Sequence, residues 1–213
     1  MTFKEIYSKF RIPPSLQEHM MRVCAVVSFL EKHWTGKHAV DWDLTKRLAL
    51  LHNMGNIVKF DLDRYPGFLG SEKNDVEYWK VVQAEVIAKY GSDDHAATQK
   101  MLREIEVSEQ VIALTLNKSF GKSVETAVSK NWPLKILYYA DFRTLPLRFG
   151  TLEERIDDVR QRMPWYANRP DFDKLVQACK KIETQIQQAI DIPVSEINDE
   201  SVLIDPSDLK LTI

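Results

Sequence analysis

Apolar side chains recur every three or four residues along most of this chain, and this spacing constrains the fold more than any other feature. A helix turns once in about 3.6 residues, so such spacing places the apolar groups on one helical face. Only 7 glycines and 9 prolines interrupt the 213 residues, and alternating apolar and polar runs are scarce before residue 192. We therefore predict an all-α fold, a helical bundle.

The predicted helices are separated by short polar turns. They span about 2–10, 15–34, 43–53, 75–90, 92–105, 108–117, 132–145, 152–163 and 171–191, and a weak helix begins at 123. Ser15 is expected to cap the second helix, with Glu18 completing a capping box. Residues 1–191 should form one helical domain. From residue 192, prolines and acids interrupt the pattern, so 192–213 should form a small hairpin or an extended docking tail.

Composition limits the classes of partner. The chain has 29 basic and 31 acidic side chains, which argues against an extended nucleic-acid surface. Cys24 and Cys179 lie within helical patterns, and we expect buried thiols in a reducing compartment. The N-terminus lacks the apolar core of a signal peptide, and no apolar run approaches the roughly 20 residues that span a bilayer. We expect a cytoplasmic protein without a membrane partner.

A histidine closes the apolar helix that ends in Leu50-Leu51-His52-Asn53-Met54-Gly55. His52 follows Leu44 and Leu48 at intervals of four residues, so its side chain should face the interior. Gly55 is placed to end this helix. Two explanations stay open for His52: a buried histidine satisfied by a neighbour, or a metal ligand.

Further polar side chains lie on apolar stripes of other predicted helices. His19 shares a face with leucines and valines, and Asp141 shares one with Leu134, Leu137 and Leu145. A buried carboxylate needs a cation, a metal or several donors. His95 is expected to face inward at a helix start. Two histidines and an aspartate favour a first-row transition metal, or a harder ion such as Mg²⁺ if more oxygens join.

The loop from Asp61 to Asn74 contains Pro66, Gly67 and Gly70. Loops of this kind can close over a site, so this one is a candidate lid above His52. A plain surface loop is the alternative, and the sequence does not decide between them.

The order and context of these residues resemble the HD-domain phosphohydrolases. The matching segments are Glu18-His19-Met20-Met21-Arg22-Val23, Leu50-Leu51-His52-Asn53-Met54-Gly55 and Tyr138-Tyr139-Ala140-Asp141, and the resemblance covers about 15–165. Members of that family are helical and hold one or two divalent metals with His, His-Asp and Asp to hydrolyse phosphate esters, usually of nucleotides.

The resemblance implies roles for individual residues. His19, His52, Asn53 and Asp141 would hold the metal, with His52 and Asn53 forming the catalytic signature pair. His95 would match an additional histidine that some members use for a second metal or for substrate. Arg22 matches the arginine that commonly follows the first histidine.

Asn53 departs from the family pattern, which has aspartate at this position. The amide oxygen can still ligate a metal, but the negative charge is missing. This loss should weaken a site for a dication and disfavour a two-metal arrangement. Lys59, Arg143 and Arg148 follow the signature segments and are candidates to bind substrate phosphate oxygens. For each, a solvated surface charge is the alternative.

Three hypotheses follow from the sequence. The first is a metal-dependent phosphohydrolase of HD type that acts on a nucleotide or another small phosphorylated metabolite. The second is a degenerate HD fold that binds a nucleotide or a partner without turnover. The third is a purely structural helical protein, in which Asp141 is paired with an arginine instead of a metal. Substrate, metal identity and oligomeric state stay open.

Overall fold

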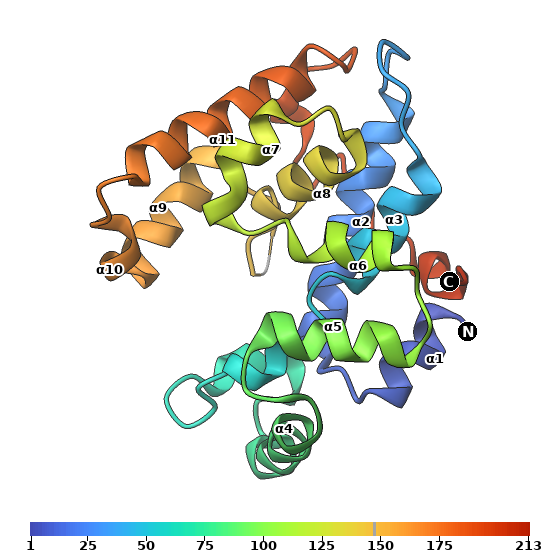
Figure 1. Ribbon diagram of the computed structural model, residues 1–213, viewed down its shortest axis with the longest axis vertical. Coiled ribbons are helices and arrows are strands. Elements are labelled where there is room, and N and C mark those ends of the chain that lie inside the picture. The colour runs from blue at the N-terminus through green and yellow to red at the C-terminus, as the bar shows by residue number, and fades with distance from the viewer. Residues whose placement is uncertain (147) are drawn as a thin grey trace. The chain divides into compact units, whose positions relative to one another are not determined.

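The computed structural model describes residues 1–146 and 148–213, which form an all-α protein as predicted (Figure 1). The α-helices are α1 (Phe3–Lys9), α2 (Pro14–Lys32), α3 (Trp42–Leu51), α4 (Val76–Tyr90), α5 (Asp94–Glu104), α6 (Glu109–Leu116), α7 (Ser123–Val128), α8 (Trp132–Phe142), α9 (Leu152–Arg162), α10 (Pro164–Ala167) and α11 (Phe172–Gln187). The 3-10 helices are η1 (Asn56–Lys59), η2 (Pro66–Glu72), η3 (Phe120–Lys122), η4 (Val194–Glu196) and η5 (Pro206–Lys210). Within the described residues, β-structure is limited to isolated bridges.

The start of α2 differs from the prediction. The helix begins at Pro14, whose fixed φ suits a first helical turn, and the Ser15 hydroxyl donates a hydrogen bond of 2.6 Å to the Phe68 carbonyl. The expected capping box of Ser15 and Glu18 is therefore wrong. Capping boxes form instead where Thr2 and Glu5 begin α1, and where Thr151 and Glu154 begin α9.

The chain divides into two compact units, and each is built from separate stretches of sequence. Unit 1 comprises Met1–Met21, Leu50–Leu116 and Asp205–Ile213, and unit 2 comprises Arg22–Ala49 and Asn117–Ile204. The residues of α2 and α3 are divided between the units.

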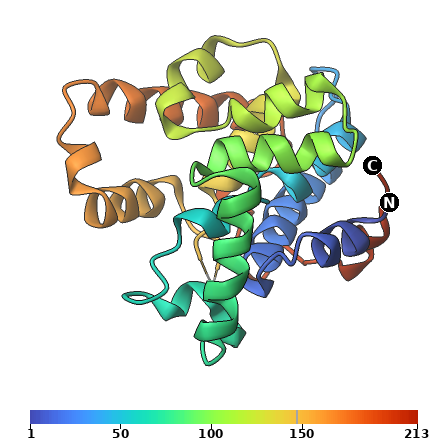
Figure 2. The same cartoon turned by 60° about the horizontal axis from the view of Figure 1, so that its bottom comes forward.

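Unit 1 is organised around α4, α5 and η1, which contact one another, while α6 packs on α5 (Figure 2). At the other end of its sequence, η5 packs against α1. The Tyr7 hydroxyl is fully buried and donates a hydrogen bond of 2.7 Å to the Leu50 carbonyl. The core of unit 1 includes Phe3, Ile6, Met20, Leu51, Met54, Val82, Met101 and Leu102.

Unit 2 is organised around α11, which contacts α7, α8 and α9 and lies beside α7 in both ribbon views (Figures 1 and 2). An isolated bridge between Trp34 and Ile190 joins the loop after α2 to the segment after α11. The core of this unit includes Val23, Val27, Leu30, Ile136, Leu137, Tyr138, Ile182 and Ile186.

The C-terminal segment forms 3-10 turns, and the hairpin expected as one alternative does not form among the described residues. Residues 192–204 belong to unit 2, with Ile197 and Val202 buried, and residues 205–213 belong to unit 1. The Phe3 N–H donates to the Leu211 carbonyl at 3.2 Å. The segment is therefore packed, and residue 192 does not mark the boundary between the units.

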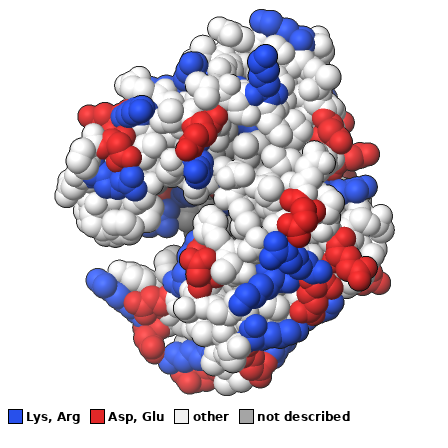
Figure 3. All heavy atoms as spheres, in the orientation of Figure 1, with Lys and Arg blue, Asp and Glu red and all other residues white. Residues whose placement is uncertain are grey.

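Charges of both signs are interspersed on the face drawn in Figure 3. Many charged side chains of the protein form ion pairs, such as Lys89 with Glu104 and Arg162 with Asp158. Both cysteines are buried, as predicted. Within the described residues, no helix has the length and apolar character needed to cross a membrane.

Candidate metal centre

His52 follows directly on the last residue of α3. Its side chain is buried because Leu48, Leu50 and Leu51 carry the end of this helix into the core, and His52 itself is 3% exposed. The helix ends at Leu51, before Gly55 is reached, so the expected role of Gly55 in ending the helix is wrong.

Gly55 instead permits a close approach to α5. Its φ of −86° is ordinary for any residue, but a Cβ atom at this position would lie 2.6 Å from the Thr98 nitrogen. The Gly55 N–H also donates a hydrogen bond of 3.0 Å to Thr98 Oγ1. The glycine thus fixes the backbone beyond His52 against α5.

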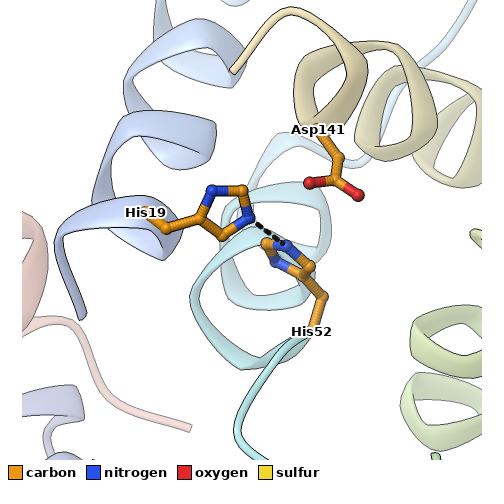
Figure 4. A group of neighbouring side chains, drawn as sticks. All are labelled: His19, His52 and Asp141. Atoms are coloured by element: carbon orange, nitrogen blue, oxygen red, sulfur yellow. Dashed lines mark hydrogen bonds between the residues drawn. The ribbon is translucent and has the colours of Figure 1, made fainter. Parts of the chain in front are cut away.

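His19 projects from α2 toward His52 (Figure 4). The two Nε2 atoms lie 3.2 Å apart, and the ring planes are inclined at 61°. His52 is buried and His19 is only half-buried, so the pair is reachable from solvent on the His19 side. Without a cation between them, one Nε2 must carry a proton and the other must accept it.

Asp141 completes this group from α8. It is 8% exposed, on a helix whose other buried residues are apolar or aromatic except for Lys135. One ligand atom from each of His19, His52 and Asp141 lies within 4.8 Å of the others (Figure 4). The three side chains that the sequence placed on separate apolar stripes therefore form one group that can hold a metal ion.

The separation of the imidazole nitrogens fits shared ligation of one ion. Metal–nitrogen bonds of about 2.0–2.1 Å at a tetrahedral angle hold two nitrogens about 3.3 Å apart. The observed distance is 3.2 Å. Imidazole nitrogens and a carboxylate oxygen suit a first-row transition metal, and this donor set leaves the identity of the ion open.

Lys118 is a component of the site that sequence reasoning missed. Its Nζ lies 3.0 Å from Asp141 Oδ2, and both side chains are 11% exposed. Lys118 lies in the turn after α6, where no apolar periodicity indicates which way a side chain points. The sequence indicated only that a buried Asp141 needs a counter-charge, and it did not indicate which basic residue supplies that charge. Lys118 is thus a basic partner of Asp141, where the structural hypothesis had expected an arginine.

Asn53 is buried next to His52, with 8% exposure. Its amide oxygen as a metal ligand stays a prediction. The absence of a carboxylate at this position leaves Asp141 as the single acidic member of the group.

His95 does not face inward, contrary to expectation. It is exposed in the first turn of α5, because that helix packs through Ala97, Thr98, Met101 and Leu102. The group of His19, His52 and Asp141 does not include it.

Arg22 lies one helical turn after His19 on α2 and is half-buried. Its Nε is buried without a hydrogen-bond partner among the described residues. The contact with substrate that the sequence predicts for Arg22 stays a prediction. Lys59, in contrast, is exposed and forms an ion pair of 2.6 Å with Asp94.

Arg143 has a structural role in the fold, and its predicted contact with substrate stays a prediction. The residue is 2% exposed, and its guanidinium donates to Tyr139 Oη and to the carbonyl oxygens of Gly150, Val194 and Ile197. The bonds to Val194 and Ile197 tie the end of α8 to the segment after α11, and the bond to Gly150 ties it to the residues before α9.

Arg148 is half-exposed and forms a bidentate pair with Glu154, with N–O distances of 2.8 and 3.2 Å. The Arg148 guanidinium holds the pKa of Glu154 at about 2. A contact between Arg148 and substrate stays a prediction.

Comparisons with protein families, with curated proteins and with solved structures found no match to this chain. The chemistry of the site is therefore argued from its own residues. Two imidazoles and a carboxylate can hold a cation, and Lys118 and Arg22 can supply positive charge toward an anionic ligand.

Proposed function

We propose that this protein is a metal-dependent phosphohydrolase of HD type that acts on a nucleotide or another small phosphorylated metabolite. The observation that carries the proposal is the group of His19, His52 and Asp141, whose ligand atoms lie within 4.8 Å of one another. Their order along the chain, in sequence motifs that resemble those of the family, supports the same proposal.

Each residue has a part in this proposal. His19 and His52 would hold the ion through Nε2, and Asp141 would supply the negative charge. A bound divalent ion lowers the pKa of its water and polarises a phosphoryl oxygen. Lys118 forms an ion pair with Asp141, and its ammonium would hold a phosphate oxygen beside that carboxylate. Arg22 would bind a second phosphate oxygen through its guanidinium, whose Nε has no hydrogen-bond partner among the described residues.

A second candidate is a regulatory module that binds a nucleotide or a partner without turnover. Two observations favour it. Asn53 lacks the charge that the family uses, and the Lys118 ammonium already provides Asp141 with a counter-charge at 3.0 Å. A site with one carboxylate and a competing lysine binds a dication less tightly than one with two carboxylates.

The deciding experiment measures metal content and hydrolysis together. Protein purified without chelator should contain or take up a divalent transition metal, and it should release phosphate from a nucleotide panel. Asn53→Asp should raise metal affinity by about tenfold or more and raise hydrolysis with it, because under this proposal the added carboxylate would face a dication. Asn and Asp are similar in size, so helix content should not change.

Asn56→Asp is the matched control, since Asn56 is also buried and lies three residues further along. It adds the same charge outside the signature pair and should not raise metal affinity. Absence of metal binding in both the natural chain and Asn53→Asp would refute the enzyme proposal. Metal-dependent hydrolysis by the natural chain would exclude the regulatory module.

A further inference from the structure

A cavity of about 570 Å³ is lined by residues of unit 2, and it shares none of them with the metal centre. Three lysines contribute to its wall, namely Lys37, Lys130 and Lys135. Among the described residues that line it there is no aspartate or glutamate. Elsewhere in the protein, cations such as Lys59, Lys80 and Arg148 have acidic partners.

One wall of the cavity is held in place by aromatic contacts. The His38 ring stacks on Trp132, with centroids 4.3 Å apart and planes at 23°. Trp34 Nε1–H donates to the His38 carbonyl at 2.8 Å, and Thr35 donates to the Ala189 carbonyl through both its N–H and its hydroxyl. The loop after α2 is therefore fixed to the end of α11. Because His38 covers a face of Trp132, the wall offers charge and hydrogen bonds more than a stacking surface.

Lys135 is the unusual member of the wall. It is 4% exposed, and its Nζ lies 4.9 Å from the centroid of the Trp132 ring. Within the part of the chain that the structure describes, it has no acidic partner. Burial lowers the pKa of this ammonium, and the nearby Lys181 lowers it further. Burying a cation without a counter-charge is costly, so the position implies an anionic partner that comes from outside the chain.

The backbone around Lys135 adds to the positive potential. Lys135 lies in the first part of α8, where the helix dipole favours negative charge and disfavours a lysine. The Leu134 N–H is already bonded to Asn131 Oδ1 at 2.9 Å. An anion here would therefore contact mainly the lysine ammonium groups.

We propose that this cavity is a binding site for a small polyanion with phosphoryl groups, such as pyrophosphate or the polyphosphate part of a nucleotide. Its volume suits a small molecule and exceeds what a single inorganic ion needs. Three strongly hydrated point charges without an opposing acid suit phosphate oxygens. The site shares no residue with the metal centre, so it does not depend on the proposed hydrolysis.

Pyrophosphate binding to the full chain tests the proposal by calorimetry. The protein is first passed over a chelating resin, which removes metals without leaving a competing anion. The natural chain should bind pyrophosphate, and Lys135→Met should weaken binding by about tenfold or more, because a charged hydrogen bond is lost. Lys174→Met removes the same charge from an exposed position of α11 outside the cavity and should have no effect. His52→Ala should also leave binding unchanged.

Thermal melting separates a ligand site from a packing role for Lys135. If the ammonium lacks a partner in the free protein, Lys135→Met melts at a higher temperature without ligand, and pyrophosphate stabilises only the natural chain. Lys130→Met, at an exposed position, should fold normally and weaken binding about threefold or more.

Three outcomes would overturn the proposal: no binding at millimolar pyrophosphate, equal binding by Lys135→Met, or a lower melting temperature of that variant without ligand. The proposal would also be overturned if an oligoglutamate peptide bound through Lys135 and pyrophosphate did not. That result would assign the cavity to an acidic protein segment.

Discussion

Single residues decide whether the group around Asp141 binds a metal, and Lys118 is the most informative of them. The ammonium and a metal ion compete for the same carboxylate, at 3.0 Å from Nζ in this structure. Lys118→Met should therefore raise metal affinity by about tenfold, while it lowers the stability of the metal-free protein by about 3 kcal/mol because a buried pair loses one partner. Added metal should restore that stability.

Lys122→Met serves as the control for Lys118. Lys122 lies in the same turn region, but its ion pair with Glu125 is exposed, so the variant should change neither metal affinity nor stability by more than about 1 kcal/mol. Titration with Zn²⁺ or Mn²⁺, followed by calorimetry and melting, measures both quantities. Unchanged metal affinity in Lys118→Met would mean that the lysine does not compete.

Arg143 carries a different kind of prediction, because its guanidinium is part of the fold. Arg143→Met should lower the free energy of unfolding by about 3 kcal/mol or more, since buried carbonyl groups would lose their donors. Arg148→Met removes an exposed pair and should cost about 1 kcal/mol or less. Urea denaturation of both variants checks this order, and a larger loss for Arg148→Met would contradict it.

The chemistry of these residues could be predicted from the sequence only in part. His19, His52 and Asp141 were predicted as members of a site because each places an imidazole or a carboxylate on an apolar stripe. A buried group of this kind needs a partner. Arg143 was assigned to substrate because its carbonyl partners lie up to 54 residues away, at positions that the sequence does not locate. Lys118 was missed because a turn has no periodicity.

At the scale of helices, apolar spacing predicted where most elements lie, while their ends depend on tertiary contacts. Ser15 and Glu18 obey the same capping pattern as Thr2 and Glu5. The two helix starts differ because the Ser15 hydroxyl donates its hydrogen bond to the carbonyl of Phe68, which lies 53 residues away in the sequence. The division of the chain into interleaved units likewise depends on contacts between distant segments.

Gly55 permits a test of how the signature segment is fixed to α5. Gly55→Ala would place a Cβ atom 2.6 Å from the Thr98 nitrogen and 2.8 Å from the Asp94 carbonyl oxygen. Since both are backbone atoms, the segment must shift, at a cost of about 2 kcal/mol or more. Gly67→Ala has no atom within 4 Å of the new Cβ and should be neutral. Melting temperatures compare the two, and equal effects would refute the close-approach argument.

At the scale of the whole molecule, each unit contains a carboxylate whose ion pairs lower its pKa. In unit 1, the Lys89 ammonium, helped by Tyr90 and Lys9, holds the pKa of Glu104 at about 2, against an ordinary value of 4.5. In unit 2, Arg148 does the same for Glu154, with a pKa of about 2. The folded state therefore binds these protons more weakly than the unfolded chain does.

The sign of the pH dependence follows from these two groups. Their contribution to stability is complete above pH 4.5 and is lost as the pH falls toward about 2, where the folded carboxylates take up protons. Both side chains are partly exposed, at 31% for Glu104 and 44% for Glu154, so solvent screening reduces each contribution to stability to about 1 kcal/mol.

Urea denaturation at about pH 5 and about pH 2.5 should show this loss of stability, and Glu104→Gln and Glu154→Gln should each reduce the loss. Gln can keep the capping box of α9, so the second variant tests the charge and not the cap. Glu200→Gln, at an exposed position without an ion pair among the described residues, should leave the acid dependence unchanged; an equal reduction there would show that general charge repulsion, and not these two pairs, sets the response to acid.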